Sequence, residues 1–324
     1  MKATARAHPI QGLVKYHGMQ DPELRLPFHD SISVCTAPSN TTTTVEFDPT
    51  LKQDHYSIDG QLLKNRSAER VVSVVDRVRD LAGIDHNVKL ESTNSFQSNI
   101  GLGSSSSGFA AAAMALCSAA DLDLSLEEIS TIARRGSSSA ARAVTGGFSI
   151  LRASKIDEDC KSYRLDDGFQ EDIRIVVAIV PAHKETESAH KEATASHMFN
   201  ARVKYAESQI YNALESIEMG DFQTLFSIAE LDSISLAATT MTGPSGWIYW
   251  KPETLRIFEG IRSLRTDEGV DAYFSTDTGA TVYINTREKH VKRVQELIES
   301  YGIPTKVWQV GSSATILDKK EDLF

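Results

Sequence analysis

The sequence predicts an α+β fold made of two halves that meet near residue 180. Short strand and helix patterns alternate before that point, whereas long helical patterns dominate from about residue 190 to 232 and again over 252–265. There is no low-complexity linker and no long charge run, so we expect an N-terminal domain over 1–180 and a C-terminal domain over 181–324 that share a tight interface.

The elements of the first half follow from local patterns. The run SISVCTAPSNTTTTVEF, residues 31–47, is rich in β-branched residues around a Pro-Ser-Asn turn, which predicts a hairpin or two neighbouring strands. The valines of 67–83 recur at helical spacing, and Gly83 stands where a C-cap would. The segment 87–93 predicts a short strand that leads into a loop rich in glycine and serine.

Later elements carry clearer boundary signals. Ser125 and Glu128 have the spacing of a capping box, and Gly136 predicts the end of that helix. The segment 173–180 is so uniformly apolar that we expect a strand buried on both faces. The other expected elements are strands over 147–153, 271–275, 281–285 and 306–310 and a helix over 287–302.

Composition excludes several classes of protein. The net charge is −10 with a pI near 5.4, which argues against nucleic acid as a partner. Cys35, Cys117 and Cys160 are widely spaced and predict neither a disulfide framework nor a zinc site. The N-terminus lacks an apolar signal core and no apolar run reaches the roughly 20 residues of a membrane span, so we expect a cytoplasmic protein without a membrane partner.

Residues 97–109, QSNIGLGSSSSGF, precede an alanine-rich helix and predict a phosphate site at its start. Glycine permits backbone geometries that a Cβ forbids, and serine hydroxyls add donors where helical N–H groups are unpaired. The alternative is an ordinary serine N-cap on a buried helix. A P-loop motif does not occur, and the match to G-x-G-x-x-G breaks at Ser106. The candidate nucleotide residues are Asn94, Gly101, Gly103, Ser104, Ser105 and Ser106.

This loop resembles the second motif of the GHMP kinase superfamily, whose members bind the ATP phosphates with it. The superfamily's leading proline is replaced here by Gln97. The resemblance implies a GHMP kinase-type fold, with an N-terminal half like domain 2 of ribosomal protein S5 and a ferredoxin-like C-terminal half. It also implies ATP and Mg²⁺ as cofactors, with the metal ligands unassigned.

Three further segments resemble the diphosphomevalonate decarboxylases within that superfamily. They read GLVKYHGMQDPELRLPFHDSISV, GSSSAARAVTGGFS and AYFSTDTGATVYI, and together with the loop they follow the family order over most of the chain. These enzymes phosphorylate the C3 hydroxyl of a mevalonate phosphate with ATP. The 3-phosphate then leaves as the carboxylate departs as carbon dioxide.

The resemblance assigns roles to individual residues. Asp277 is the candidate base for the hydroxyl, Arg142 grips the substrate carboxylate and phosphates, and Lys15 neutralises charge near the scissile end. The alternative for Asp277 is an aspartate of an ordinary turn with no catalytic role. The alternative for Arg142 and for Lys15 is a surface ion pair. Further substrate-binding candidates are Tyr16, Met19, Ser137, Ser139 and Ser196.

Met19 stands where the family has a second lysine that helps to bind the diphosphate. The loss of a cation favours a less charged substrate, so we expect decarboxylation of 5-phosphomevalonate to isopentenyl phosphate with ADP, phosphate and CO₂ as co-products. Another cation, such as Arg25, Lys64 or Arg66, would instead allow 5-diphosphomevalonate. More distant alternatives are a mevalonate 3-kinase and a non-catalytic GHMP-fold regulator.

Two other expectations concern metal binding and assembly. His183, His190 and His197 recur every seventh residue, but metal-binding helical histidines usually lie three or four apart, so a metal ladder is not favoured. A homodimer is the assembly that we consider for this chain.

Overall fold

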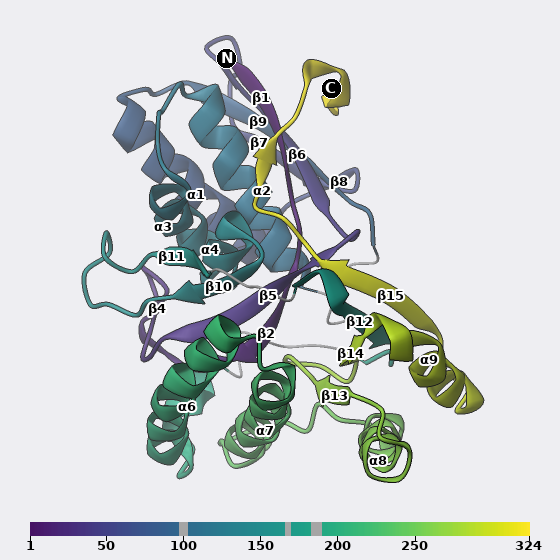
Figure 1. Ribbon diagram of the computed structural model, residues 1–324. Helices are drawn as coiled ribbons and strands as arrows, with labels where there is room; N and C mark the ends of the chain where they lie inside the picture. Colours follow the sequence, from purple (N-terminus) through teal and green to yellow (C-terminus); the bar gives the residue numbers. More distant parts are fainter. Residues whose placement is uncertain (97–102, 166–169, 183–189) are drawn as a thin grey trace.

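The computed structural model describes residues 1–96, 103–165, 170–182 and 190–324, which form the predicted α+β fold (Figure 1). Two large sheets run through the molecule, and helices cover both. The helices are α1 (Asn65–Ala82), α2 (Ser104–Ala119), α3 (Leu126–Gly136), α4 (Ser138–Thr145), α6 (Phe199–Met219), α7 (Phe222–Met241), α8 (Pro252–Glu268) and α9 (Val291–Ser300).

The first sheet packs against α2 and shares one hydrophobic core with α1, α3 and α4. Its strands, in spatial order, are β16 (Thr315–Ile316), β1 (Lys2–Ala7), β6 (Thr41–Asp48), β9 (Asn87–Asn94), β7 (His55–Ile58) and β8 (Gln61–Leu62). The core between sheet and helices contains the valines of α1 and the alanines of α2. Small side chains on α2 let this helix lie close to β1 and β6, so the start of α2 is fixed beside the sheet.

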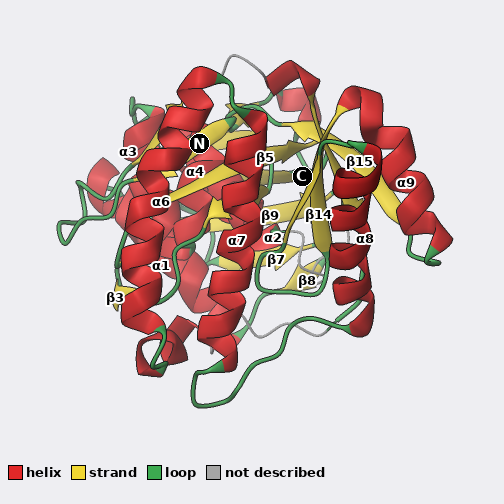
Figure 2. Cartoon of the chain, turned by 60° about the horizontal axis from the view of Figure 1, so that its bottom comes forward, coloured by secondary structure: helices red, strands yellow, loops and turns green. Residues whose placement is uncertain are grey.

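The second sheet is antiparallel and crosses between the two halves of the chain. In spatial order it contains β11 (Ser162–Leu165), β10 (Phe148–Leu151), β5 (Ser31–Ala37), β15 (Thr305–Val310), β12 (Ile173–Ala178), β14 (Val282–Arg287) and β13 (Ala272–Ser275), with β2 (Ile10–Val14) also paired to β5. Figure 2 shows α6, α7 and α8 in front of its strands. Alternate residues of β12 enter two different cores, which confirms the expectation of a strand buried on both faces.

Several local predictions are confirmed. Helix α1 ends at Ala82 with Gly83 in the left-handed conformation at φ 64°. Ser125 and Glu128 form a capping box at the start of α3, which ends at Gly136. The helical region expected from about residue 190 is interrupted: residues 190–192 are helical, a 3₁₀ turn follows over Ala193–Ala195, and α6 begins at Phe199.

The expected hairpin over 31–47 is wrong. Strands β5 and β6 both form, but they belong to different sheets: β5 pairs with β2, β10 and β15, whereas β6 pairs with β1 and β9. The turn between them, which contains Pro38, carries the chain from one sheet to the other. Strand partners distant in sequence therefore replace the local pairing.

The C-terminal segment returns to the first half of the chain. Strand β15 pairs with β5, and β16 pairs with β1, while β12 from the first 180 residues pairs with β14 and β15. These pairings join the regions on either side of residue 180 by continuous sheet. The division into domains at residue 180 stays a prediction about folding units. Within the described residues, none of the helices has the length and apolarity needed to span a bilayer.

Candidate active site

Lys15 and Asp277 meet where the end of β2 approaches the turn between β13 and β14. The Gly12 amide donates a hydrogen bond to Oδ1 of Asp277 at 3.1 Å. A Cβ at Gly12 would lie 2.7 Å from Cγ of Lys15 and 3.1 Å from Oδ1 of Asp277. The register of β2 against β5 shifts between Gly12 and Val14, a bulge of the kind that re-aims side chains. Glycine is thus required for the lysine stem to lie beside the aspartate.

The ammonium group of Lys15 is buried and has two partners on α7. Its Nζ lies 3.3 Å from Oδ2 of Asp232 and 3.1 Å from Oγ of Ser233. Burial lowers the pKa of Lys15, and the carboxylates of Asp232 and Asp277 oppose that shift. Our sequence analysis missed Asp232 and Ser233, because one Asp-Ser pair within a long helix carries no motif signal.

Arg142 lies on α4 and is also buried. Its Nη1 donates to Oγ of Ser31 on β5, and its guanidinium lies 5.6 Å from the ring centroid of Tyr16. Burial lowers the pKa of Arg142 to about 10, and the charge of Asp277 acts in the opposite direction. The guanidinium is therefore still protonated at neutral pH. Asp277 thus interacts electrostatically with two buried cations, Lys15 directly after β2 and Arg142 on α4.

Tyr16 connects Arg142 to a cavity. Its ring stacks on His190 with centroids 5.3 Å apart and an interplanar angle of 11°. His190 accepts a hydrogen bond from the Gly18 amide at Nδ1, at 3.3 Å. Both His190 and Met19 line a cavity of about 590 Å³. The predicted substrate residues Tyr16 and Met19 are thereby joined to one recess, and His190 is an additional wall residue.

The charge of this cavity is mainly positive. Its charged lining residues are Arg25, Arg66, Arg70, Arg135, Lys191, Glu23 and Glu69. Met19 lies among these cations, so the replacement of a lysine by methionine leaves a basic recess rather than an apolar one. Such a recess suits a phosphate group.

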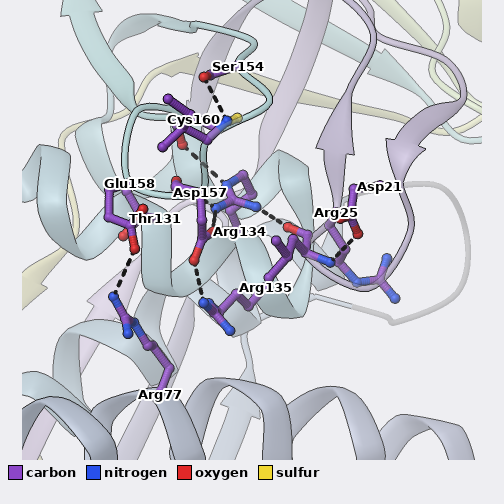
Figure 3. Close-up of polar contacts among 12 residues, drawn as sticks. Asp21, Arg25, Arg77, Thr131, Arg134, Arg135, Ser154, Asp157, Glu158 and Cys160 are labelled. Atoms are coloured by element: carbon purple, nitrogen blue, oxygen red, sulfur yellow. Dashed lines mark hydrogen bonds and ion pairs between the residues drawn. The ribbon is translucent and has the colours of Figure 1, made fainter.

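One wall of the cavity is held by a buried arginine of α3. Arg134 donates to the carbonyl oxygens of Leu24 and Cys160. Figure 3 shows Arg134 and Arg135 converging on Asp157, with Arg25 on a neighbouring loop. Arg25 itself has a φ of 55°, in the left-handed region. The network therefore fixes the loop that presents Arg25 to the cavity.

The predicted serines take different positions. Ser137 occupies the position before α4 without capping it through its side chain, and its Oγ lies 2.9 Å from Oγ of Ser139, one turn before Arg142. Ser196 is buried and its Oγ lies 2.6 Å from Oγ1 of Thr242 at the end of α7. Ser137 and Ser139 are thus near the arginine, whereas the hydroxyl of Ser196 is engaged with α7.

A second cavity, of about 270 Å³, lies at the start of α2. Asn94, Ser104 and Ser105 line it, together with Arg70, which also lines the larger cavity. Gly103 precedes α2 with a φ of 76°, and a Cβ there would lie 3.1 Å from Cβ of Pro9. The two cavities are therefore neighbours that share one arginine.

Ser106 differs from the other serines of this loop. Its buried Oγ donates to the Gly103 carbonyl at 2.6 Å and accepts from the Ile10 amide at 3.1 Å. This is not the serine N-cap that we considered as the alternative, because Gly103 is the N-cap of α2 and no side chain caps the helix there. Gly101 lies outside the described residues. The nucleotide role of Ser104 and Ser105, one half-buried and one exposed, stays a prediction.

The histidines of the 183–197 stretch do not form a ladder in the described residues. His183 lies outside them, His190 stacks on Tyr16, and His197 is exposed. Among the described residues no group of three or more histidine, cysteine or acidic side chains is placed to hold a metal ion. The Mg²⁺ ligands accordingly stay unassigned.

Comparison with known proteins identifies the family. A model of the diphosphomevalonate decarboxylase-like N-terminal domain matches residues 7–162. Phosphomevalonate decarboxylase of Haloferax volcanii is 61% identical over 324 residues, which is 100% of both chains. The chain belongs to the mevalonate phosphate decarboxylase family. This result confirms the resemblance stated on the four sequence motifs.

Solved structures of mevalonate diphosphate decarboxylases share the fold. The crystal structure of the Staphylococcus aureus protein has a TM-score of 0.93 at 26% identity and covers 98% of each chain. MDDEF in complex with MVAPP, AMPPCP and magnesium has a TM-score of 0.92 at 26% identity and covers 98% of this chain and 99% of that one. The GHMP-type α+β architecture is thus confirmed for this member of the decarboxylase family.

Proposed function

We propose that the protein catalyses the ATP-dependent decarboxylation of 5-phosphomevalonate to isopentenyl phosphate, with release of ADP, phosphate and CO₂. The observation that carries this proposal is that Asp277 interacts electrostatically with both Lys15 and Arg142, although the three residues come from separate segments. The relative in Haloferax volcanii, which is named phosphomevalonate decarboxylase and is 61% identical, supports the same activity.

The residues suit the two steps of the reaction. Asp277 accepts the proton of the C3 hydroxyl while the hydroxyl oxygen attacks the γ-phosphorus of ATP. The bond from C3 to the new phosphate then breaks, CO₂ leaves from C1, and the electrons of the C1–C2 bond form the C2–C3 double bond. Arg142 holds the carboxylate until it leaves, and Lys15 offsets the charge of the phosphate that departs.

The nucleotide site proposed here is the cavity at the start of α2. Backbone N–H groups at a helix start favour phosphate, and Ser104 and Ser105 add hydroxyl donors there. Gly103 fits this role because the chain passes close to Pro9. Bound Mg²⁺ would neutralise phosphate charge, and the MDDEF complex with AMPPCP and magnesium supports both cofactors.

The preference for a monophosphate rests on Met19. Met19 lines the basic cavity, and its thioether stands where the diphosphate enzymes have a cationic lysine. The alternative activity is decarboxylation of 5-diphosphomevalonate, which is favoured by Arg25 and Arg66 in the same cavity. Lys64, the third cation that we considered, does not appear among the described residues that line it.

The decisive experiment measures ADP, CO₂ and the alkene product from purified protein with each substrate. We expect all three products from 5-phosphomevalonate with Mg²⁺ and ATP. ADP without CO₂ would identify a 3-kinase, and the absence of both would favour a ligand-binding regulator. Higher kcat/KM for the diphosphate would identify the alternative decarboxylase.

Location and assembly are further proposals. Cys35, Cys117 and Cys160 are buried free thiols, which suits a reducing cytoplasm. Light scattering of the purified protein tests the homodimer, which stays a prediction.

A further inference from the structure

Asp232 on α7 is a buried carboxylate that no sequence motif includes. It is fully buried and lies between two buried cations. Its Oδ2 is 3.3 Å from Nζ of Lys15, and its Oδ1 is 2.6 Å from Nη2 of Arg202 on α6. A carboxylate without such partners would be strongly destabilised in this position, so the three charges form one unit.

The same pair holds the backbone of Lys15. Oδ2 of Asp232 accepts the Lys15 amide at 3.1 Å, and Nη2 of Arg202 donates to the Lys15 carbonyl at 2.6 Å. The residue directly after β2 is therefore attached to α6 and α7 through both of its peptide groups and its ammonium. These contacts determine where the lysine stem begins and where its charge ends.

The charges around Lys15 explain why a second carboxylate is useful. Asp232 faces its ammonium from α7, Asp277 from the turn after β13 and Arg202 from α6, while Ser233 contributes a neutral hydroxyl. Burial and Arg202 disfavour the charged lysine, and the two carboxylates favour it. When Asp277 accepts the substrate proton, its negative charge is lost. Asp232 is then the remaining carboxylate beside Lys15 in the described part of the chain.

We propose that Asp232, supported by Arg202, is a positioning residue that orients Lys15 and keeps it protonated while Asp277 carries the substrate proton. The inference rests on the proposed function for the role of Asp277. It adds to that function a second negative charge on α7, the Asp232 carboxylate, which does not touch the reacting atoms.

The test is Asp232→Asn, which keeps the shape and removes the charge. We expect kcat to fall at least tenfold at pH 9 and less at pH 7, because loss of the anion makes Lys15 easier to deprotonate. The alkaline limb of kcat/KM should move down by about 1–3 pH units, while the KM for ATP stays within about twofold. An unchanged limb in a folded Asp232→Asn protein would overturn the proposal.

Glu230→Gln is the matched control on the same helix. Glu230 is a buried carboxylate that pairs with Arg262 at 3.1 Å and Arg265 at 3.2 Å, away from Lys15. Its loss should lower thermal stability without moving the alkaline limb. An equal movement of the limb in Glu230→Gln would show that Asp232→Asn acts through general destabilisation, which also overturns the proposal.

Two further measurements keep the test decisive. If Asp232→Asn does not fold, Asp232→Asn combined with Arg202→Met removes both buried charges. The limb should still move down, because the effect of Asp232 on Lys15 exceeds that of Arg202. The ¹⁵N chemical shift of Lys15 Nζ, assigned by its loss in Lys15→Arg, should titrate at lower pH in the variant. An equal titration midpoint in wild type and Asp232→Asn overturns the proposal, whether or not the wild type shows turnover. Missing turnover in the wild type rejects only the proposed function.

Discussion

The Gly12 amide donates a hydrogen bond to Oδ1 of Asp277 at 3.1 Å and joins segments that are 265 residues apart. The contact places the candidate base beside the stem of Lys15, because the same glycine leaves space for both side chains. The first two predictions follow from this contact, because we expect Gly12, Lys15 and Asp277 to act together.

Asp277→Asn should retain the fold and lose turnover by about 10²–10⁴-fold, because the amide preserves the shape but cannot accept the proton. The Gly12 contact survives, since the amide oxygen accepts the same hydrogen bond. Release of ADP and CO₂ at saturating substrate measures the effect, and ATP binding is checked by calorimetry. Asp318→Asn, at an exposed position, should behave as wild type. Turnover near the wild-type value in folded Asp277→Asn would remove Asp277 from catalysis.

Gly12→Ala should displace Lys15 from Asp277, because the new Cβ would lie 2.7 Å from Cγ of the lysine. We expect kcat to fall at least tenfold with a smaller change in stability. Gly243→Ala is the comparison, because its nearest contact would be an ordinary 3.5 Å and its φ is not positive. The prediction is wrong if both alanine variants have the same kcat.

Arg142→Lys should be severe despite the retained charge. An ammonium cannot reproduce the planar fork that reaches Ser31 and the substrate together. Loss of a charged hydrogen bond costs about 1.5–3 kcal/mol, which corresponds to at least a tenfold fall in kcat/KM. Arg152→Lys, at a half-exposed ion pair with Asp30, should have little effect. Similar kinetics for the two lysine variants would contradict a bidentate role for Arg142.

Met19→Lys should reduce the preference for 5-phosphomevalonate over the diphosphate. A new cation in the basic cavity would contribute about 1.5–3 kcal/mol to binding of the extra phosphate if the contact is fully formed, and less if solvent screens it. Steady-state kcat/KM for both substrates gives the ratio. Met219→Lys, at an exposed position on α6, controls for the added charge. A ratio unchanged by Met19→Lys alone would assign the preference to other residues, such as Arg25 or Arg66.

Much of the fold could be predicted because its signals are local. The left-handed Gly83 after α1, the capping box at Ser125 and Glu128, and the apolar run that became β12 each depend on residues within a few positions of one another. The hairpin prediction was wrong because the pairing of β5 and β6 depends on partners from both ends of the chain.

The sequence by itself determined the family and pointed to Lys15, Arg142 and Asp277 as the candidate catalytic residues, since these stand in ordered motifs whose residue types suit phosphoryl transfer and decarboxylation. Only the tertiary structure decided which groups surround them. Asp232 lies 217 residues from Lys15, and nothing in its neighbours distinguishes it from a solvent-exposed helical aspartate. Burial explains the position of Asp232, because a lysine and an arginine removed from water require a nearby anion. The packing of α6 and α7 against β2 places the carboxylate of Asp232 between Lys15 and Arg202.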